Sequence, residues 1–215
     1  MTLIMIYYNI HTHQLPEHIN EKAIVSLNLR EHFSLEKNFY YSAGIHPWYA
    51  DKEMLDKFYS IAIQSSVVAI GEAGLDKLTD TPLELQKEIF LIQINFAEEL
   101  QKPLIIHCVK AWQELIAIYK KTKPSIPWII HGFRGKGTLA KQLLETGFYL
   151  SFGQYYQPEA AIEAWNHRQL YLETDDHEIN IQTVYASISS TLNVPSSKLS
   201  EVIMNNLQKW PNNPF

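Results

Sequence analysis

Short, almost continuously apolar runs recur along this chain, and most of them are separated by longer segments whose apolar residues fall at helical spacing. Runs of this kind predict strands that are buried on both faces, as in a parallel sheet covered by helices. The predicted strands are Leu3–Tyr8, Ala23–Leu29, Phe39–Ile45, Val67–Ile70, Leu104–Ile106, Trp128–Ile130, Phe148–Phe152 and Leu170–Leu172. Eight such strands predict an α/β fold, a single (β/α)8 TIM-like barrel.

Helices are predicted between most of these strands and after the last one. They are Lys52–Gln64, Leu83–Gln101, Ala111–Lys121, Thr138–Thr146, Glu159–Asn166, Ile181–Leu192 and Ser197–Gln208. The first two connections between strands are too short for full helices. No Gly/Ser linker or low-complexity tract interrupts the pattern, so we expect residues 1–215 to form one domain.

The charge and cysteine content narrow the class of protein. A net charge of −5 supplies no global basic field, which excludes a protein that coats polyanions. The single cysteine, Cys108, cannot form an internal disulfide, and this favours a reducing compartment. The apolar run Leu3–Tyr8 is too short for a membrane span and lacks the preceding positive charge of a signal peptide. We expect a cytoplasmic protein with no membrane partner; the oligomeric state is left open.

Side chains that can bind metals follow five of the predicted strands at their carboxyl ends. In a parallel barrel these ends share one face, so residues far apart in sequence converge on one pocket. The six residues are His11, His13, Glu72, His107, His131 and Asp175. Four imidazoles and two carboxylates predict a site for two divalent metal ions, and Zn²⁺, Mn²⁺, Mg²⁺ and Ni²⁺ all suit such a set.

Two of these histidines lie in the segment Asn9-Ile10-His11-Thr12-His13. Residues two apart on a strand point to the same side, so His11 and His13 can reach one metal ion. A lone histidine at a strand end is more often a hydrogen-bonded core residue, and an isolated carboxylate more often caps a loop. Because metal-binding side chains occur together at five strand ends, we favour a metal site over these separate structural roles.

Longer motifs surround these residues. They are His11-Thr12-His13, Gly44-Ile45-His46-Pro47, Gly71-Glu72-Ala73-Gly74-Leu75-Asp76, a helix with Gln86, Phe90, Gln93 and Ala97, Ile105-Ile106-His107, Ile130-His131-Gly132-Phe133 and Leu172-Glu173-Thr174-Asp175. Through nearly its whole length the chain resembles the TatD-like metal-dependent hydrolases of the amidohydrolase superfamily, many of which are described as deoxyribonucleases. The resemblance implies a barrel that cleaves phosphodiester bonds of DNA or short nucleic acids at a binuclear metal site.

The resemblance also implies how the ligands are shared. Residues that match His11 and His13 hold one ion, and those that match His107 and His131 hold the second. Glu72 matches the carboxylate that bridges the two ions, which makes it one of two predicted catalytic residues.

The other predicted catalytic residue, Asp175, matches the aspartate that ligates the first ion and takes the proton of the attacking water. His46 matches a position near the substrate phosphate, and Arg134 is a further phosphate candidate because of its charge and its closeness to His131. Asn9 stands where the family usually has an aspartate behind the metal ligands. We therefore expect altered metal affinity or ligand orientation.

Two alternatives to a nuclease stay open. A barrel hydrolase can act on an amide or ester bond, because the same activated water can attack a carbonyl. Asn9 and shortened loops also fit a metal-binding protein with weakened catalysis. The expected partner is nucleic acid or a small phosphodiester as substrate. Tyr155 and Tyr156 follow the seventh predicted strand, where an aromatic side chain can line a substrate groove, and His177 is a candidate for its rim.

Overall fold

The computed structural model describes residues 5–215, so Leu3 and Ile4 of the first predicted strand lie outside the described residues. Among residues 5–215, eight strands follow one another in chain order in the sheet, which confirms the predicted α/β arrangement. The strands are β1 (Tyr7–Thr12), β2 (Glu21–Asn28), β3 (Tyr40–Gly44), β4 (Val67–Asp76), β5 (Leu104–Val109), β6 (Trp128–Ile130), β7 (Tyr149–Phe152) and β8 (Leu170–Leu172).

Helices follow most of these strands. They are the 3₁₀ helices η1 (Pro47–Tyr49) and η2 (Lys52–Met54) and the α-helices α1 (Leu55–Ala62), α2 (Leu83–Leu100), α3 (Trp112–Thr122), α4 (Gly137–Thr146), α5 (Pro158–His167), α6 (Ile181–Leu192) and α7 (Ser196–Leu207). As predicted, no helix connects β1 to β2 or β2 to β3 within the described chain. No helix of residues 5–215 has the length and apolar character that crossing a membrane requires.

Several strands are longer than predicted, and this corrects the placement of three candidate ligands. The predicted strands ended at the first polar residue, yet β1, β4 and β5 continue through His11, Glu72 and His107. His107 pairs with Gly74, whereas His11 and Glu72 lie at register shifts between paired residues of their strands. The polar side chains are therefore held by strands and not by the loops after them.

The described chain divides into two compact units. The first comprises the chain up to Val25, residues 131–209 and Phe215; the second comprises residues 26–130 and 210–214. That residues 1–215 form a single domain stays a prediction.

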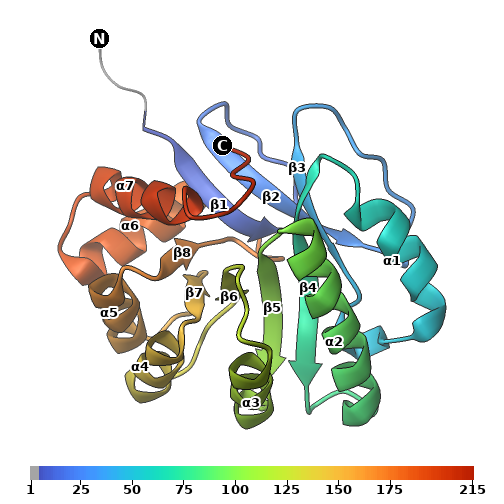
Figure 1. Ribbon diagram of the computed structural model, residues 1–215. Coiled ribbons are helices and arrows are strands. Elements are labelled where there is room, and N and C mark those ends of the chain that lie inside the picture. Colours follow the sequence, from blue (N-terminus) through green and yellow to red (C-terminus); the bar gives the residue numbers. More distant parts are fainter. Residues whose placement is uncertain (1–4) are drawn as a thin grey trace. The chain divides into compact units, whose positions relative to one another are not determined.

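The first unit contains β1, the first half of β2, β7 and β8, together with helices α4 to α7. Pairings β1–β2 and β7–β8 are parallel. Helices α6 and α7 pack on β1 and β8, and α4 packs on β7 (Figure 1). Tyr185 of α6 is fully buried and its hydroxyl accepts the backbone N–H of Tyr8 at 3.0 Å. These contacts tie β1 to the C-terminal helices of the chain.

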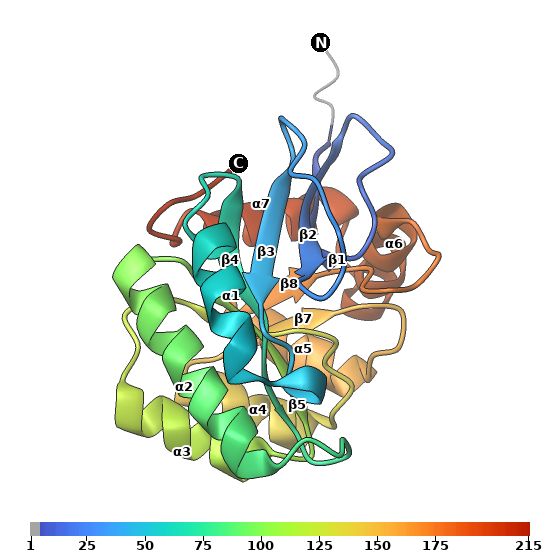
Figure 2. The same cartoon turned by 90° about the vertical axis from the view of Figure 1, so that its right-hand side faces the viewer.

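The second unit contains β3 to β6 and helices α1 to α3. Its strand pairings β3–β4, β4–β5 and β5–β6 are parallel. Helices α1 and α2 lie along β4, as two views show (Figures 1 and 2). A Cβ atom at Gly44 would lie 2.6 Å from the carbonyl oxygen of Glu72. Glycine therefore lets β3 approach β4 next to a candidate ligand.

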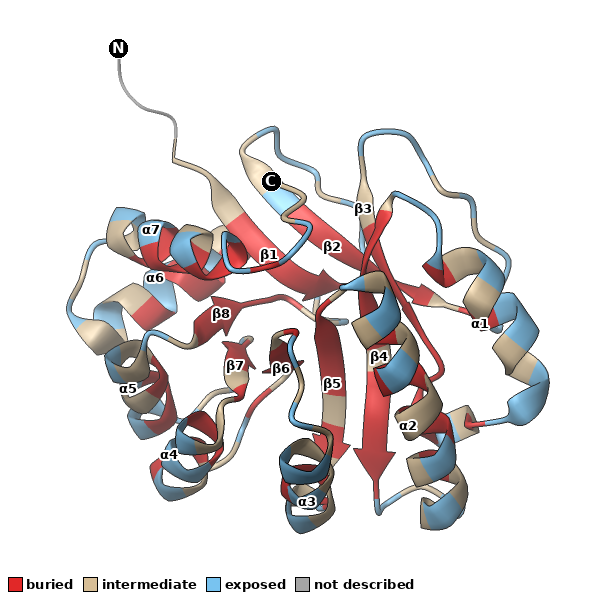
Figure 3. Cartoon of the chain, in the orientation of Figure 1, coloured by how far each residue is buried: buried red, intermediate tan, exposed pale blue. Residues whose placement is uncertain are grey.

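Burial follows the pattern expected of helices that cover a sheet. The strands are mostly buried along their length, whereas each helix shows a buried stripe and an exposed stripe (Figure 3). In the second unit, Phe90 of α2 and Trp128 of β6 are fully buried, with ring centroids 5.7 Å apart in an edge-to-face contact. Such pairs fix the helices against the strands that carry the candidate site.

Two buried glutamines of α2 hold the carboxyl ends of β3 and β4. The Gln93 side chain accepts the Ile45 N–H at 2.7 Å and donates to the Ile45 carbonyl at 3.1 Å. In the same way, Gln86 accepts the Asp76 N–H at 2.7 Å and donates to its carbonyl at 2.9 Å. Each side-chain amide satisfies both backbone groups of one residue, so α2 sets the position of the segments that carry His46 and Asp76.

Replacement of Gln93 by leucine tests this bracing. The variant leaves the N–H and the carbonyl of Ile45 buried without their partner, and we expect the free energy of unfolding to fall by about 2–5 kcal/mol. Urea denaturation measures the change. The control is Gln64→Leu, because the Gln64 amide donates to a surface carbonyl, that of Ser60. Equal stability of the two variants would contradict the bracing role.

Candidate functional site

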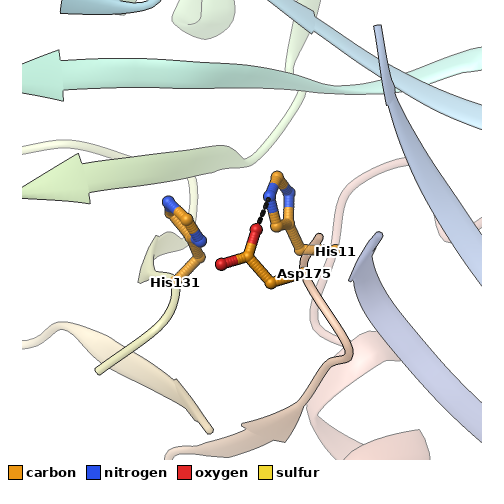
Figure 4. A group of neighbouring side chains, drawn as sticks. All are labelled: His11, His131 and Asp175. Carbon is orange, nitrogen blue, oxygen red and sulfur yellow. Dashed lines mark ion pairs between the residues drawn. The ribbon is translucent and has the colours of Figure 1, made fainter. Parts of the chain in front are cut away.

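In the first unit, four of the predicted metal ligands come together. His11, His131 and Asp175 each offer one ligand atom, and these atoms lie within 4.8 Å of one another (Figure 4). The His11 Nε2 atom lies 3.4 Å from Asp175 Oδ1, and the His13 Nε2 atom lies 3.7 Å from the same oxygen. The two histidines of the β1 segment therefore lie near one carboxylate oxygen, and that they bind one metal ion stays a prediction.

The backbone of Asp175 is fastened to β1. Its N–H donates to the His11 carbonyl at 3.1 Å, and its own carbonyl accepts the His13 N–H at 3.1 Å. Asp175 has a φ of 57°, a left-handed conformation that aspartate tolerates better than most residues. Because both hydrogen bonds go to the histidine segment, the carboxylate and the two imidazoles are positioned together.

Asn9 links β1 to β2 and to the segment after β8. It is buried, and its Nδ2 group donates to Glu21 Oε1 and to Thr174 Oγ1, both at 2.9 Å. Its Oδ1 atom accepts the Thr174 N–H at 3.1 Å. An aspartate has no N–H to donate to Glu21. The amide of Asn9 therefore suits a site where the neighbouring side chain, Glu21, is itself a carboxylate. Asn9 also positions Thr174, the residue before Asp175.

The partner of Asn9 is a partly buried carboxylate. Burial raises the pKa of Glu21 above its usual value, and the hydrogen bond from Asn9 offsets this rise only in part. Asn9 and Glu21 also line an open cleft of about 430 Å³ in the first unit. The charged form of Glu21 therefore carries a cost in the folded protein.

The second unit holds a separate group. His46, Glu72 and His107 offer ligand atoms within 4.8 Å of one another. The His46 Nε2 and His107 Nδ1 atoms each lie 3.5 Å from Glu72 Oε1. The two predicted phosphate contacts belong to different units: His46 lies in this group, and Arg134 lies in the first unit near His177.

A carboxylate stands behind His107. The Nε2 atom of His107 lies 3.1 Å from Asp76 Oδ2, which also accepts the indole N–H of Trp48 at 2.7 Å. Burial raises the pKa of Asp76, but the hydrogen bonds from Trp48, from the Leu78 N–H and from His107 together outweigh burial and bring the pKa below its usual value. A charged Asp76 fixes the proton of His107 on Nε2, so that the lone pair of Nδ1 points toward Glu72.

His46 has the same tautomer preference as His107 but turns its other ring nitrogen toward Glu72. Its Nδ1 atom accepts the backbone N–H of Trp48 at 3.2 Å. In the neutral ring the proton is therefore on Nε2, the atom that faces Glu72. His46 thus presents a hydrogen-bond donor where His107 presents a lone pair.

Glu173 is the carboxylate that lies beside His131, as Asp76 lies beside His107. It is fully buried, its Oε1 atom accepts the Gly132 N–H at 2.6 Å, and the same oxygen lies 3.5 Å from His131 Nδ1. Sequence reasoning assigned no role to Asp76 or Glu173. The sequence did contain an indication that Asp76 belongs to the site: it lies four residues after Glu72 on β4, so both side chains face the same side of the strand.

Solved structures match the fold over nearly the whole chain. The crystal structure of YJJV, a TatD homologue from Escherichia coli K12, has a TM-score of 0.74 at 20% identity and covers 97% of this chain and 98% of that one. A TatD family hydrolase from Entamoeba histolytica has a TM-score of 0.76 at 14% identity and covers 98% and 100%. These matches confirm the predicted (β/α)8 barrel fold.

Relatives narrow this fold to a family. The TatD related DNase family model matches residues 17–211, so the chain belongs to that family, as its motifs predict. The metal-dependent hydrolase YabD of Bacillus subtilis (strain 168), named as uncharacterized, is 34% identical over 152 residues, which are 65% of this chain and 60% of the relative. A protein of Citrobacter koseri named 3'-5' ssDNA/RNA exonuclease TatD is 33% identical over 117 residues, 51% and 44% of the two chains. The chain thus spans about half the length of the curated relatives it matches.

Replacement of Glu21 by glutamine tests the cost of its charge. Glutamine keeps an acceptor for Asn9 and removes an ionisable group whose folded pKa is raised. A raised pKa makes the charged form costly above the folded pKa, and this cost vanishes as the pH falls below the usual value of 4.5. We expect Glu21→Gln to be more stable than the parent at pH 7, with a smaller difference at pH 4, in urea denaturation at both values. Glu17→Gln, at an exposed position of the same cleft, is the control. A gain that grows toward pH 4 would refute the assignment.

Replacement of Asn9 by aspartate tests the coupling between positions 9 and 21. The variant places a second carboxylate at the 2.9 Å contact with Glu21, and we expect a loss of about 2 kcal/mol in the free energy of unfolding at pH 7. The double variant Asn9→Asp/Glu21→Gln should recover most of this loss, because its glutamine can donate to the new carboxylate. Thermal denaturation of the four proteins in chelator gives the comparison, and additive effects would argue against the coupling.

Proposed function

We propose that this protein is a metal-dependent phosphodiesterase that cleaves DNA or short single-stranded nucleic acids. Membership of the TatD related DNase family supports the reaction class. The observation that carries the proposal is that two candidate ligand histidines, His107 and His131, each have a carboxylate beside one ring nitrogen. Such carboxylates fix the tautomer of a metal-binding histidine and raise its basicity. A cytoplasmic location stays a prediction.

The donor atoms fit divalent cations in both units. Imidazole nitrogens and carboxylate oxygens suit Zn²⁺, Mn²⁺ and Ni²⁺, and the carboxylates also suit Mg²⁺. In the proposal, the first unit offers His11, His13, His131 and Asp175, and the second unit offers Glu72 and His107. That two ions bind, that Glu72 bridges them, and that His131 shares an ion with His107 remain predictions from the family resemblance.

When bound, divalent ions lower the pKa of water and polarise a phosphoryl oxygen. In the reaction we propose, a water oxygen attacks phosphorus while Asp175 accepts the proton of that water. The bond from phosphorus to the leaving oxygen breaks, giving a phosphate monoester and an alcohol. His46, whose Nε2–H faces Glu72, is proposed to donate to a phosphoryl oxygen of the substrate, and Arg134 is proposed to pair with a substrate phosphate.

The two alternatives fit the site less well. Hydrolysis of an amide or ester needs no cationic contact for a phosphate, whereas Arg134 borders the recess that Asp175 lines. The alternative of weakened catalysis rested on Asn9 and on shortened loops. Since Asn9 has hydrogen-bond partners for its donor and acceptor atoms alike, its amide is suited to its surroundings and is no sign of a decayed site.

The central test is Asp175→Asn. Asparagine keeps the shape of the side chain but cannot take a proton from water, and we expect kcat on a single-stranded oligonucleotide to fall about 10²–10⁴-fold. Chelator should abolish the activity of the parent, and readdition of Mn²⁺, Zn²⁺, Mg²⁺ or Ni²⁺ in separate reactions identifies the active ion. Asp176→Asn is the matched control, because Asp176 is the adjacent, exposed carboxylate. Undiminished hydrolysis in Asp175→Asn, or in metal-free parent, would overturn the proposal.

A further inference from the structure

Three side chains from three segments meet in the first unit; we call them the rim cluster: Arg134, Tyr155 and His177. They follow β6, β7 and β8, respectively. The guanidinium carbon of Arg134 lies 5.3 Å from the centroid of the Tyr155 ring, and its Nη2 atom lies 3.4 Å from His177 Nε2. The rings of Tyr155 and His177 stand edge to face with centroids 5.2 Å apart. Each member thus contacts both of the others.

The rim cluster borders the candidate metal group of the first unit. Its three members line the same small recess as Asp175 and Glu173. Gly132 lines it too, and a Cβ atom there would lie 3.6 Å from Glu173 Oε1 and 3.9 Å from Asp175 Oδ2. The lack of a side chain at Gly132 leaves room beside the two carboxylates. A group bound at the rim cluster would therefore be next to the proposed proton acceptor.

The hydrogen bonds of the cluster leave Arg134 able to bind an anion. A guanidinium has five N–H donors and no acceptor, so the contact with His177 requires that Nε2 accepts. The proton of a neutral His177 ring is then on Nδ1, 3.4 Å from Asp176 Oδ1. This contact uses one donor of Arg134 and keeps its full positive charge. In a chain with a net charge of −5, it supplies a local cation beside the recess.

Tyr155 offers an aromatic surface. Although Arg134 and His177 both pack against it, Tyr155 remains 56% exposed. A ring held by two neighbours loses little conformational freedom when a ligand stacks on it, and base–aromatic stacking tolerates any base because every base has a π-face. The cluster therefore combines a stacking surface with a cation 5.3 Å from the centroid of its ring.

We propose that the rim cluster is a nucleotide subsite, in which Tyr155 stacks a base of a single-stranded substrate and Arg134 pairs with the phosphate of that nucleotide. This inference rests on the proposed function and adds to it a base-stacking contact at Tyr155. A base inside a duplex is stacked and paired on both sides, so a single-stranded segment reaches Tyr155 without the cost of unpairing. A small phosphodiester without a base would use Arg134 alone.

The test separates binding from catalysis. The full chain in chelator is titrated with a fluorescent oligothymidine and with an abasic strand of the same length, and fluorescence anisotropy gives the two affinities. We expect Tyr155→Ala to weaken binding of the base-bearing strand by about 5- to 100-fold and to leave the abasic strand unchanged. Tyr155→Trp should restore the preference for the base-bearing strand, because tryptophan also stacks.

Substitutions of Arg134 should change binding in a different way from substitutions of Tyr155. Arg134→Gln should weaken binding of both strands to a similar degree and reduce the slope of log affinity against log salt by about one. Arg134→Lys should keep most of that slope. The matched controls are Trp165→Ala and Arg168→Gln, because Arg168 lies over the Trp165 ring at 5.4 Å, a contact of the same kind at the end of α5. Both controls should bind as the parent does.

The results distinguish this inference from the proposed function. If the parent cleaves oligonucleotides but Tyr155→Ala binds both strands as the parent does, the subsite is wrong and the function stands. If the parent prefers the base-bearing strand through Tyr155 and cleaves no phosphodiester, the function is wrong and the subsite stands. A parent that binds neither strand, or that binds both equally, also overturns the subsite.

Discussion

The hydrogen bonds between the end of β1 and the segment after β8 are the interaction on which the first-unit site depends. They join the backbone of Asp175 to His11 and His13 and so bring a carboxylate and two imidazoles from opposite ends of the chain together. Asn9 strengthens this joint through Thr174. Without these hydrogen bonds, the backbone would not hold Asp175 beside the two histidines. Backbone hydrogen bonds therefore set the positions of His11, His13 and Asp175 as much as their side chains do.

A second constraint is the pairing of histidines with carboxylates behind them. Asp76 lies 3.1 Å from one ring nitrogen of His107, and Glu173 lies 3.5 Å from one ring nitrogen of His131. We propose that the other nitrogen of each ring binds a cation. Trp48 extends this pairing in the second unit, since its indole N–H donates to Asp76 and its backbone N–H donates to His46. One tryptophan thereby orients two histidines of the same tautomer, which present different nitrogens to Glu72: His107 its Nδ1 lone pair and His46 its Nε2–H.

Much of the fold could be predicted from the sequence, because the apolar runs that mark its strands are local features of the chain. Trp128–Ile130 and Leu170–Leu172 are apolar throughout, and both strands have the predicted bounds. Strand β4 extends six residues beyond its predicted end at Ile70, because its glycines and carboxylates are not typical of a strand interior. Its last four residues, 73–76, pair with β5, and this pairing could not be predicted from β4 alone. The hydrogen bond from Asn9 to Glu21 joins β1 to β2, so it could not be predicted from the sequence of either strand. It explains why an asparagine is suited to position 9, where the family usually has an aspartate.

The central claim is that this chain binds divalent cations through nitrogen atoms selected by buried carboxylates. A crystal structure of the Mn²⁺-loaded protein, with the ions located by anomalous scattering, tests it most directly. The account predicts peaks about 2.0–2.3 Å from His11 Nε2 and an Asp175 oxygen, and from His107 Nδ1 and a Glu72 oxygen. Peaks at His107 Nε2 in place of Nδ1, or no peak at either group, would contradict it.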